Sequence, residues 1–578
     1  MAGYPRELCN GERAVVFLFV SRVLASVPLS LSVEAVAFVL LAVAALLVEI
    51  AVESSEVVLC RFKTRAGVSS GILLGAITLP GVMLSRLIQL SRVLSEHDNV
   101  HEGTELPYLN MQYWTVSMCC FCVLIFFLTL LRHSHVNTSS FQFCGPRASV
   151  YSSLYVASYI FMCYFSLAMK SDGVSGWLAA SNMLCLLCHG LATVKLIQHT
   201  LHTFPSCASI GETLLVSSGL VLYFGDMLVH TLSKMDFFFL SSQRYFHPYG
   251  SRSEIATLIQ GMLLGLLLLP AFYKSLLKFW VYFTTMGKQR AQAAEGLRQR
   301  EVGDSTIFYA SLLVVLTTLV PAWMHFVQDF DMHPLLWVLN FVFTDPLKRL
   351  ALCTYWICVI CASVLRFYGI SKNSKTERIL LRKYYHLVAV LIFLPALLFQ
   401  PAFLDLAFGA ALAVFLILEM IRVWKIWPLG NIVHQFMNAF TDHRDSDILI
   451  VSHFSLLLGC ALPKWMSSGF NDRPLAPFAG ILSLGIGDTM ASMVGHKYGV
   501  LRWSKTGKKT IEGTAAGITS VLAACSMLLP LLASSGFILS QHWLSLLIAV
   551  ILSGLLEAYT AQLDNAFIPL IFYSLLCL

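Results

Sequence analysis

Long apolar blocks recur along the whole chain, each about 17–25 residues long, which is the length that a helix needs to cross roughly 30 Å of hydrocarbon. Of the 578 residues, 57% are hydrophobic and 12% are charged, about half of the roughly 25% charged fraction of soluble domains. This composition excludes an ordinary soluble globular chain and a disordered one. A membrane β-barrel would show segments of about ten residues with alternating polarity, and these blocks do not alternate. The sequence therefore predicts an all-α, polytopic transmembrane helical protein with about 15–17 spans.

The two parts of the chain differ in where their polar residues lie. In residues 1–300 the loops between blocks carry no recognisable chemical motif. In residues 301–578, and above all after residue 380, charged and glycine-rich clusters stand at the ends of the blocks. Glu12 and Arg13 precede the first block, so we expect a retained anchor rather than a cleavable signal peptide. We predict an N-terminal multi-span membrane region, 1–300, that serves as a scaffold, and a C-terminal multi-span catalytic region, 301–578.

Lys and Arg gather on alternate loops of the second part. The loop 366–383 holds six Lys or Arg residues against the single acid Glu377, and the positive-inside rule places such a loop in the cytosol. The net charge of +7 therefore bears on orientation rather than on nucleic acid. The loops expected on the opposite face, near residue 400 and at 536–542, hold no Lys or Arg. Pairs of spans return the chain to the cytosolic face at 422–447, 495–512 and 557–562.

The segment from Gly485 to Gly517 combines acidic, basic and glycine residues between two apolar blocks. Asp488 ends one block, and Glu512 stands where the next begins. Carboxylates hold Mg²⁺, Lys and Arg neutralise phosphate oxygens, and glycines let backbone N–H groups approach a phosphate at a helix N-terminus. The set predicts a polyphosphate–magnesium site with Asp488 as metal ligand; the alternative is a basic loop that only sets membrane topology. The residues expected around the phosphates are Gly495, Gly499, Arg502, Lys505, Gly507, Lys508, Lys509 and Thr510.

Two familiar nucleotide-binding patterns do not account for this segment. The run 507–510, Gly-Lys-Lys-Thr, lacks the earlier glycine of a Walker P-loop. His443, Arg444 and Asp445 imitate the HRD run of a protein kinase, but neither a DFG run nor a glycine-rich loop accompanies them.

Further polar clusters stand at the ends of other blocks. His386 begins an apolar run, where it is either an interface residue or part of a site. Asp445 lies in an acidic run, 442–447, that is either a solvated loop or a place where a metal or a proton binds. Glu557 and Asp564 flank a short polar stretch between two apolar blocks, and ionisable groups at membrane depth usually face a cavity.

A further pair, Glu419 and Arg422, lies one helical turn apart at the end of a block. We expect a local ion pair there.

These motifs together resemble the polyprenol kinase family, which uses CTP, and dolichol kinases within it. The resemblance covers about residues 350–578. The same arrangement of motifs is similar, more distantly, to that of phosphatidate cytidylyltransferases. One departure is Ile511, where relatives usually carry an aromatic residue. The runs that carry the resemblance are GDTMAS at 487–492, KKTIEG at 508–513, RKYYHL at 382–387, DHRDS at 442–446 and LEAYTAQLDN at 556–565.

The resemblance implies transfer of the γ-phosphoryl group of CTP to the terminal hydroxyl of dolichol, at the cytosolic side of the endoplasmic reticulum membrane. It implies a CTP-binding segment over about 495–511, with Arg502, Lys508 and Lys509 on the triphosphate and Mg²⁺ at Asp488. Glu512 is expected to orient a lysine or bind the metal. The acceptor of the hydroxyl proton is left open among His386, Asp445 and Asp564. Residues 1–300 would be a lipid-facing scaffold or a groove for the polyprenol tail.

Two alternatives stand beside this expectation. A cytidylyltransferase would make a CDP-lipid from phosphatidate and release pyrophosphate instead of CDP. A membrane transporter would use the buried carboxylates as an ion path. Many transporters show internal repeats, and none is visible in this sequence.

Overall fold

A computed structural model describes most of the chain, and every structural statement below concerns the described part. That part contains helices and a single isolated β-bridge, and no strand element. The described residues are 10–55, 62, 69–96, 105–135, 146–169, 176–204, 206–240, 253–287, 293–328, 330–373, 378–438, 450–467, 472–503, 509–534 and 543–578.

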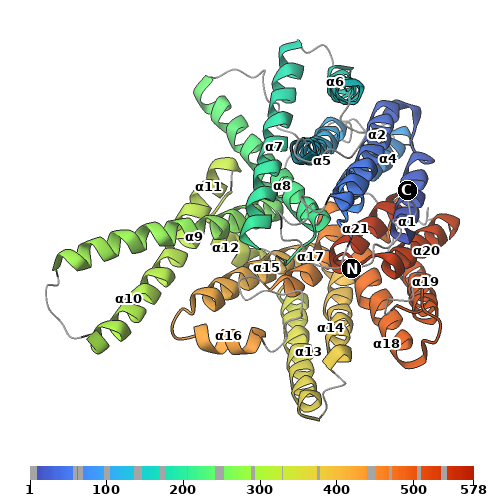
Figure 1. The fold of residues 1–578 in the computed structure, drawn as a ribbon. Coiled ribbons are helices and arrows are strands. Elements are labelled where there is room, and N and C mark those ends of the chain that lie inside the picture. Colours follow the sequence, from blue (N-terminus) through green and yellow to red (C-terminus); the bar gives the residue numbers. More distant parts are fainter. Residues whose placement is uncertain are drawn as a thin grey trace. The chain divides into compact units, whose positions relative to one another are not determined.

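The chain forms two compact units (Figure 1). The first combines residues 1–226, 370–390 and 458–578, and the second combines 227–369 and 391–457. The boundary between these units does not fall at residue 300, because the last helices of the chain pack with the first ones. The functional division at residue 300 stays a prediction.

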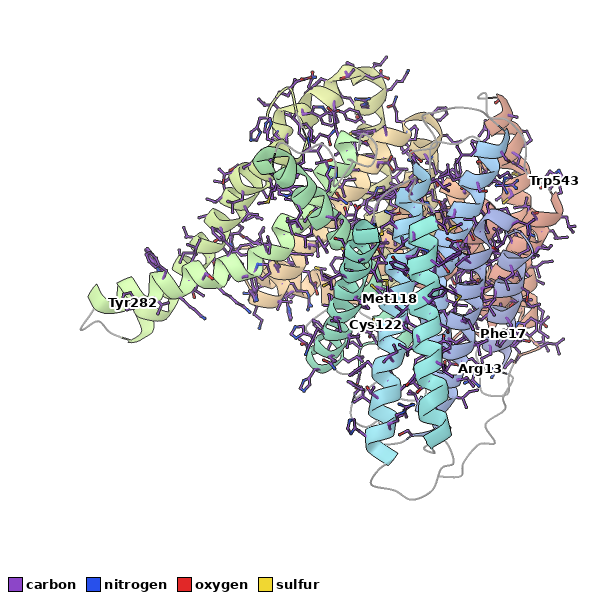
Figure 2. The ribbon with its side chains drawn as sticks, turned by 90° about the horizontal axis from the view of Figure 1, so that it is seen from above. Arg13, Phe17, Met118, Cys122, Tyr282 and Trp543 are labelled. Atoms are coloured by element: carbon purple, nitrogen blue, oxygen red, sulfur yellow. The ribbon has the colours of Figure 1, made fainter. Side chains whose placement is uncertain are left out.

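The first unit is a helix bundle in which α21 packs on α4 and α20 packs on α1. Met118 of α5, labelled in Figure 2, is fully buried in it. A 3₁₀ turn, Ala476–Phe478, and a π-helical segment, Ile481–Asp488, precede α18. The helices of this unit are α1 (Gly11–Leu24), α2 (Ser32–Ser54), α4 (Ile72–Glu96), α5 (Glu105–His135), α6 (Pro146–Met169), α7 (Gly176–Thr203), α18 (Thr489–Tyr498), α19 (Ile511–Ser534), α20 (Trp543–Tyr559) and α21 (Asp564–Cys577).

The second unit is built around α9 and α15, which pack on each other through Ile259 and the close contact at Gly409. Tyr273, Phe308 and their aliphatic neighbours form its apolar core, whereas Tyr282 of α9, labelled in Figure 2, is exposed. Its helices are α9 (Glu254–Gly287), α10 (Ala293–Val314), α11 (Val320–Val327), α12 (Pro334–Thr344), α15 (Pro401–Trp424) and α16 (Gly430–Asn438). Four helices have residues in both units: α8 (Ile210–Leu240), α13 (Pro346–Asn373), α14 (Arg378–Phe399) and α17 (Val451–Met466).

The predicted fold class is confirmed. Among the described helices, 11 are long and apolar enough to cross a membrane, and five shorter apolar helices accompany them. The expected number of 15–17 spans stays a prediction, since length and composition alone do not place a helix in a bilayer. Several helices expose large apolar side chains, such as Phe161 and Leu365, as helices that face lipid do.

Candidate active site

Asp488 lies inside the first unit, at the junction of the π-helical segment and α18, and its residue is only 3% exposed. The sequence predicts that Asp488 ends an apolar block. The structure places a 3₁₀ turn and the wider π-helical turns before α18. Single π-helical turns inside helices recur at functional sites. Here the segment ends at the one carboxylate for which we predicted a central role.

Helix α14 brings two cationic or protonatable groups to Asp488. The Nζ atom of Lys383 lies 2.7 Å from Oδ1 and 2.5 Å from Oδ2 of Asp488. The Nδ1 atom of His386 lies 3.1 Å from Oδ2. Lys383 and His386 are three residues apart and therefore share one face of the helix. The hydrogen bonds hold the buried carboxylate charged and fix its orientation.

His386 is buried and its ring is oriented by two acceptors. Its Nδ1 atom faces both the Asp488 carboxylate and the backbone oxygen of Leu484, the latter at 3.2 Å. Two acceptors around one ring nitrogen place a proton on that nitrogen. In the neutral imidazole, Nε2 then carries the lone pair that can accept a proton.

Two described stretches of the predicted nucleotide segment, 501–503 and 509–511, pair with each other before α19. We call this pair of stretches the hairpin. Arg502 and Thr510 make an antiparallel bridge, and Arg502 is exposed. Both carboxylate oxygens of Glu512 accept the backbone N–H of Leu501, at 3.0 and 3.2 Å. Thr510 acts as the N-cap of α19, because its Oγ1 atom accepts the backbone N–H of Gly513 at 3.2 Å. Glu512 therefore ties the first turn of α19 to Leu501.

The predicted glycines allow α18 and α19 to pack closely. A Cβ atom on Gly495 or Gly499 would lie 2.9 or 2.6 Å from Oγ1 of Thr510. A Cβ atom on Gly513 would lie 2.6 Å from the backbone oxygen of Ala491. The structure thus gives these glycines a packing role, and contact of their backbone with CTP stays a prediction.

Glu557 and Asp564 approach this site from the ends of α20 and α21. The carboxylates of Asp488, Asp564 and Glu557 all act electrostatically on the Lys383 ammonium group. Lys509, from the hairpin, donates a hydrogen bond to the backbone oxygen of Glu557. The tertiary structure therefore brings three acidic side chains and two lysines, from four separate stretches of the chain, into one cluster.

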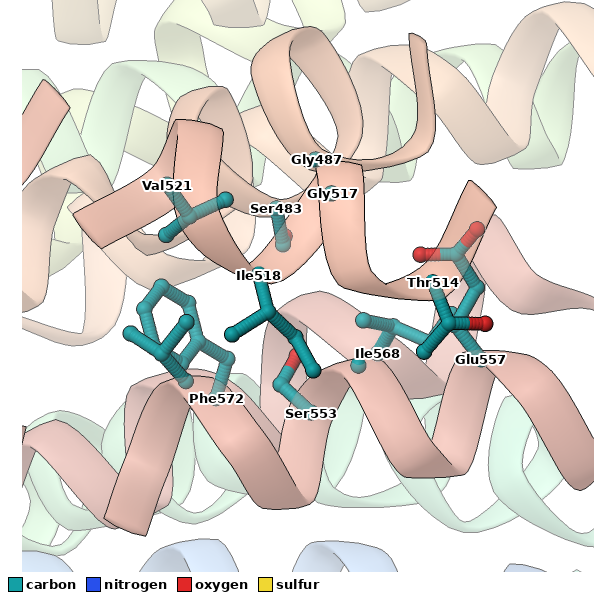
Figure 3. Close-up of a pocket in the computed structure, with 12 residues that line it drawn as sticks. Ser483, Gly487, Thr514, Gly517, Ile518, Val521, Ser553, Glu557, Ile568 and Phe572 are labelled. Atoms are coloured by element: carbon teal, nitrogen blue, oxygen red, sulfur yellow. The ribbon is translucent and has the colours of Figure 1, made fainter. Parts of the chain in front are cut away.

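A narrow cavity leads from this cluster between α19, α20 and α21 (Figure 3). Glu557 and Thr514 lie at one end of it, and Val521 and Phe572 lie at the other. Of the clustered acids, only Glu557 lines this small cavity, and the rest of its lining is mostly apolar or small side chains.

The predicted site residues fall into three groups. Asp488, His386, Asp564 and Lys509 come together. A second group lies at the hairpin and at the contact of α18 with α19: Gly495, Gly499, Arg502, Thr510 and Glu512. The predictions for Asp445, Lys505, Gly507 and Lys508 lie outside the described residues. Lys383 and Glu557 are functional candidates that the predicted set omitted. A signal was present for both: Lys383 precedes His386 by one helical turn, and Glu557 precedes Asp564 across a short turn.

The expected ion pair of Glu419 and Arg422 is confirmed, in the second unit. Two hydrogen bonds of 2.9 and 2.7 Å join the side chains, and Arg422 is 1% exposed. Glu419 also accepts the backbone N–H of Ile450 at 3.0 Å. Glu419 thus links the end of α15 to the residue that precedes α17.

Within the described ranges, no group of three or more His, Cys, Asp or Glu side chains is placed to hold a metal ion. Mg²⁺ commonly binds through one or two carboxylates together with substrate phosphates. The donor chemistry near Asp488 fits such a shared site, because the neighbouring acidic side chains Glu557 and Asp564 add further oxygen donors.

Comparison with known proteins identifies the family of the chain. A family model described as dolichol kinase matches residues 177–468. The "Dolichol kinase EVAN" of Arabidopsis thaliana is 59% identical over 575 residues, which cover 98% of each chain. The dolichol kinase of Homo sapiens is 33% identical over 67% of this chain and 68% of its own length. The dolichol kinase of Saccharomyces cerevisiae is 33% identical over 41% of this chain and 43% of its own. No solved structure matches the chain. The near full-length similarity shows that the chain belongs to the dolichol kinase family.

Proposed function

We propose that the chain transfers the γ-phosphoryl group of CTP to the terminal hydroxyl of dolichol, with its site on the cytosolic face of the endoplasmic reticulum membrane. The observation that supports this best is the cluster of Lys383, His386 and Asp488 at the ends of apolar helices. A dolichol tail stays in the bilayer and CTP stays in water, so a kinase for this pair needs a site where the two phases meet.

Phosphoryl transfer depends mainly on positioning and on neutralising phosphate charge. Lys509 and Arg502 are placed on the hairpin, and Lys505 and Lys508 belong to the same basic segment. We assign these residues to the triphosphate. Lys383, which reaches Asp488 from α14, is a further candidate for charge neutralisation.

Mg²⁺ completes the proposal. Asp488, with Glu557 or Asp564, would hold the ion, which when bound neutralises charge on the phosphate oxygens. The oxygen donors that Glu557 and Asp564 add beside Asp488 support this assignment.

Of the three predicted proton acceptors, the geometry favours His386. Its Nδ1 side is oriented by Asp488 and Leu484, which leaves the Nε2 lone pair for the substrate hydroxyl. In the proposed step, the dolichol oxygen forms a bond to the γ-phosphorus while the bond to the β–γ bridging oxygen breaks. CDP leaves, and the hydroxyl proton passes to His386. Asp564 and Asp445 remain the alternatives for this proton.

An assay with CTP labelled on either the α- or the γ-phosphorus tests the function. The purified protein should move the γ-label into dolichyl phosphate and release CDP, with little transfer from ATP or to phytol and diacylglycerol. An α-label in the lipid with released pyrophosphate would identify a cytidylyltransferase instead. Solute flux into vesicles without CTP consumption would identify a transporter.

A further inference from the structure

The turn at 560–563 determines where two of the clustered acids stand. Glu557 lies in the last turn of α20, and Asp564 is the first residue of α21. Only four residues separate the two helices, so a shift of this turn moves both carboxylates relative to Lys383. The contacts of this turn therefore set the positions of the two carboxylates in the site.

Gln562, in this turn, is 1% exposed, and its side-chain amide bonds to residues from the first half of the chain. Its Nε2 atom donates to the backbone oxygen and to Oγ of Ser69, both at 3.0 Å. Its Oε1 atom accepts a hydrogen bond from the hydroxyl of Ser209. The amide thus joins the segment that precedes α4 to the segment that precedes α8.

The segments before α4 and α8, which bond Gln562, are themselves held by local contacts. Ser209 and Glu212 form a capping box at the start of α8: the Ser209 hydroxyl accepts the Glu212 N–H at 3.1 Å, and the Glu212 carboxylate accepts the Ser209 N–H at 2.9 Å. Gly71 has a φ of +65°, and a Cβ atom there would lie 2.6 Å from Cδ of Gln562. Only glycine combines a positive φ with so close an approach to the Gln562 side chain at little cost in free energy.

Helix α1 contacts the same turn from another side. The buried carboxylate of Glu12 faces the Thr560 side chain and the Ala561 backbone. A Cβ atom on Gly11 would lie 2.2 Å from the ring of Tyr559. The Tyr559 ring in turn packs against Trp503 of the hairpin, with 5.1 Å between ring centroids.

Ion pairs connect α1 to α2 behind these contacts. Arg13, labelled in Figure 2, bonds Glu49 at 2.8 Å and Glu53 at 2.9 Å. Glu53 accepts the N–H of Ser70 at 3.1 Å, and Glu49 accepts the N–H of Leu73 at 2.8 Å. A polar network therefore runs from α1 and α2 to the segment before α4, whose residue Ser69 accepts the hydrogen bonds of Gln562.

We infer that Gln562 and Glu12 are positioning residues, through which α1, α4 and α8 hold the turn at 560–563 so that Glu557 and Asp564 face the site. The inference rests on the proposed function, since it concerns the reaction at that site. It gives the N-terminal helices a direct part in the geometry of catalysis. The contacts are specific hydrogen bonds of buried groups, and a purely lipid-facing scaffold has no need of them.

Gln562→Ala, in the full-length protein in lipid nanodiscs, tests the inference. Displacements near 1 Å in a site cost about 100-fold in rate, so we expect kcat to fall about 10- to 100-fold. The KM for CTP should stay within about two-fold of the parent value, because the basic hairpin is unchanged. The milder Ser209→Ala, which removes one hydroxyl, should lower kcat in the same direction by about three- to ten-fold.

Gln89→Ala is the matched control. Gln89 is also a buried glutamine of the first unit, 4% exposed, and it bonds Asp472 at 2.7 Å through its amide. We expect Gln89→Ala to lose thermal stability but to keep kcat within about two-fold. Equal losses of kcat in Gln89→Ala and Gln562→Ala would show a general effect on folding and overturn the inference.

Unchanged kcat in Gln562→Ala would also overturn it. If Gln562→Ala does not fold, Ser209→Ala decides, and an unchanged kcat in that variant counts against the inference. A parent protein that lacks CTP-dependent phosphorylation of dolichol would instead overturn the proposed function, so the two failures are distinguishable.

Discussion

At the scale of the residue, the buried Asp488 and the partly buried Lys383 form an ion pair whose members depend on each other. Removing one partner of such a pair leaves the other charge buried without compensation. Their contacts of 2.5 and 2.7 Å make the pair the best defined feature of the site. Single and double variants of Asp488 and Lys383 can therefore separate the role of the pair in catalysis from its role in stability.

We expect Asp488→Asn to lose both thermal stability and nearly all kinase activity, because the partly buried Lys383 would be left without its counter-ion. The double variant Asp488→Asn with Lys383→Met should regain most of the lost stability and none of the activity. Thermal melts and labelled-CTP assays on the same preparations measure the two effects. Recovery of activity in the double variant would assign the pair a structural role alone. Lys195→Met, at an exposed lysine of α7, should change neither quantity.

At the scale of the element, α18 and α19 approach each other closely because small residues face each other along the contact. Gly513 lies against the backbone of Ala491 and Gly495, and backbone atoms cannot move aside as a flexible side chain does. The hairpin that carries Arg502 and Lys509 joins these two helices. Their packing thus sets where the basic residues stand.

Gly513→Val should separate the two helices and lower stability by about 1–3 kcal/mol, the usual cost of overpacking. We also expect a raised KM for CTP, since the hairpin is displaced with the helices. Ala515→Val on the same helix is the control, because Ala515 is exposed. Chemical denaturation and CTP titrations measure the two effects, and a Gly513→Val protein that matches Ala515→Val in both would contradict this account.

At the scale of the whole molecule, the orientation of the loops decides which side of the membrane supplies the nucleotide. The hairpin segment 495–512 is basic and the segment 536–542 has no Lys or Arg, which predicts opposite sides. A glycosylation sequon inserted into 536–542 should be used in the endoplasmic reticulum lumen, whereas one inserted at 504–508 should not. Glycosylation at both insertions, or at 504–508 alone, would contradict the proposed cytosolic site.

The sequence by itself determined the helical membrane class and singled out several of the residues that the structure gathers around Asp488. Apolar block length is a local property, so the all-α fold can be read without any contact. Asp488, His386, Asp564 and Lys509 were also predicted, because charged and protonatable groups at the ends of apolar blocks are costly and therefore conspicuous.

Only the tertiary structure decided which of these groups meet. Lys383 pairs with a carboxylate 105 residues away, and the Gln562 amide bonds Ser69, 493 residues away. No periodicity in the sequence encodes such pairs, because they depend on how helices pack in space. For the same reason the N-terminal helices, which carry no chemical motif, proved to hold the turn between Glu557 and Asp564.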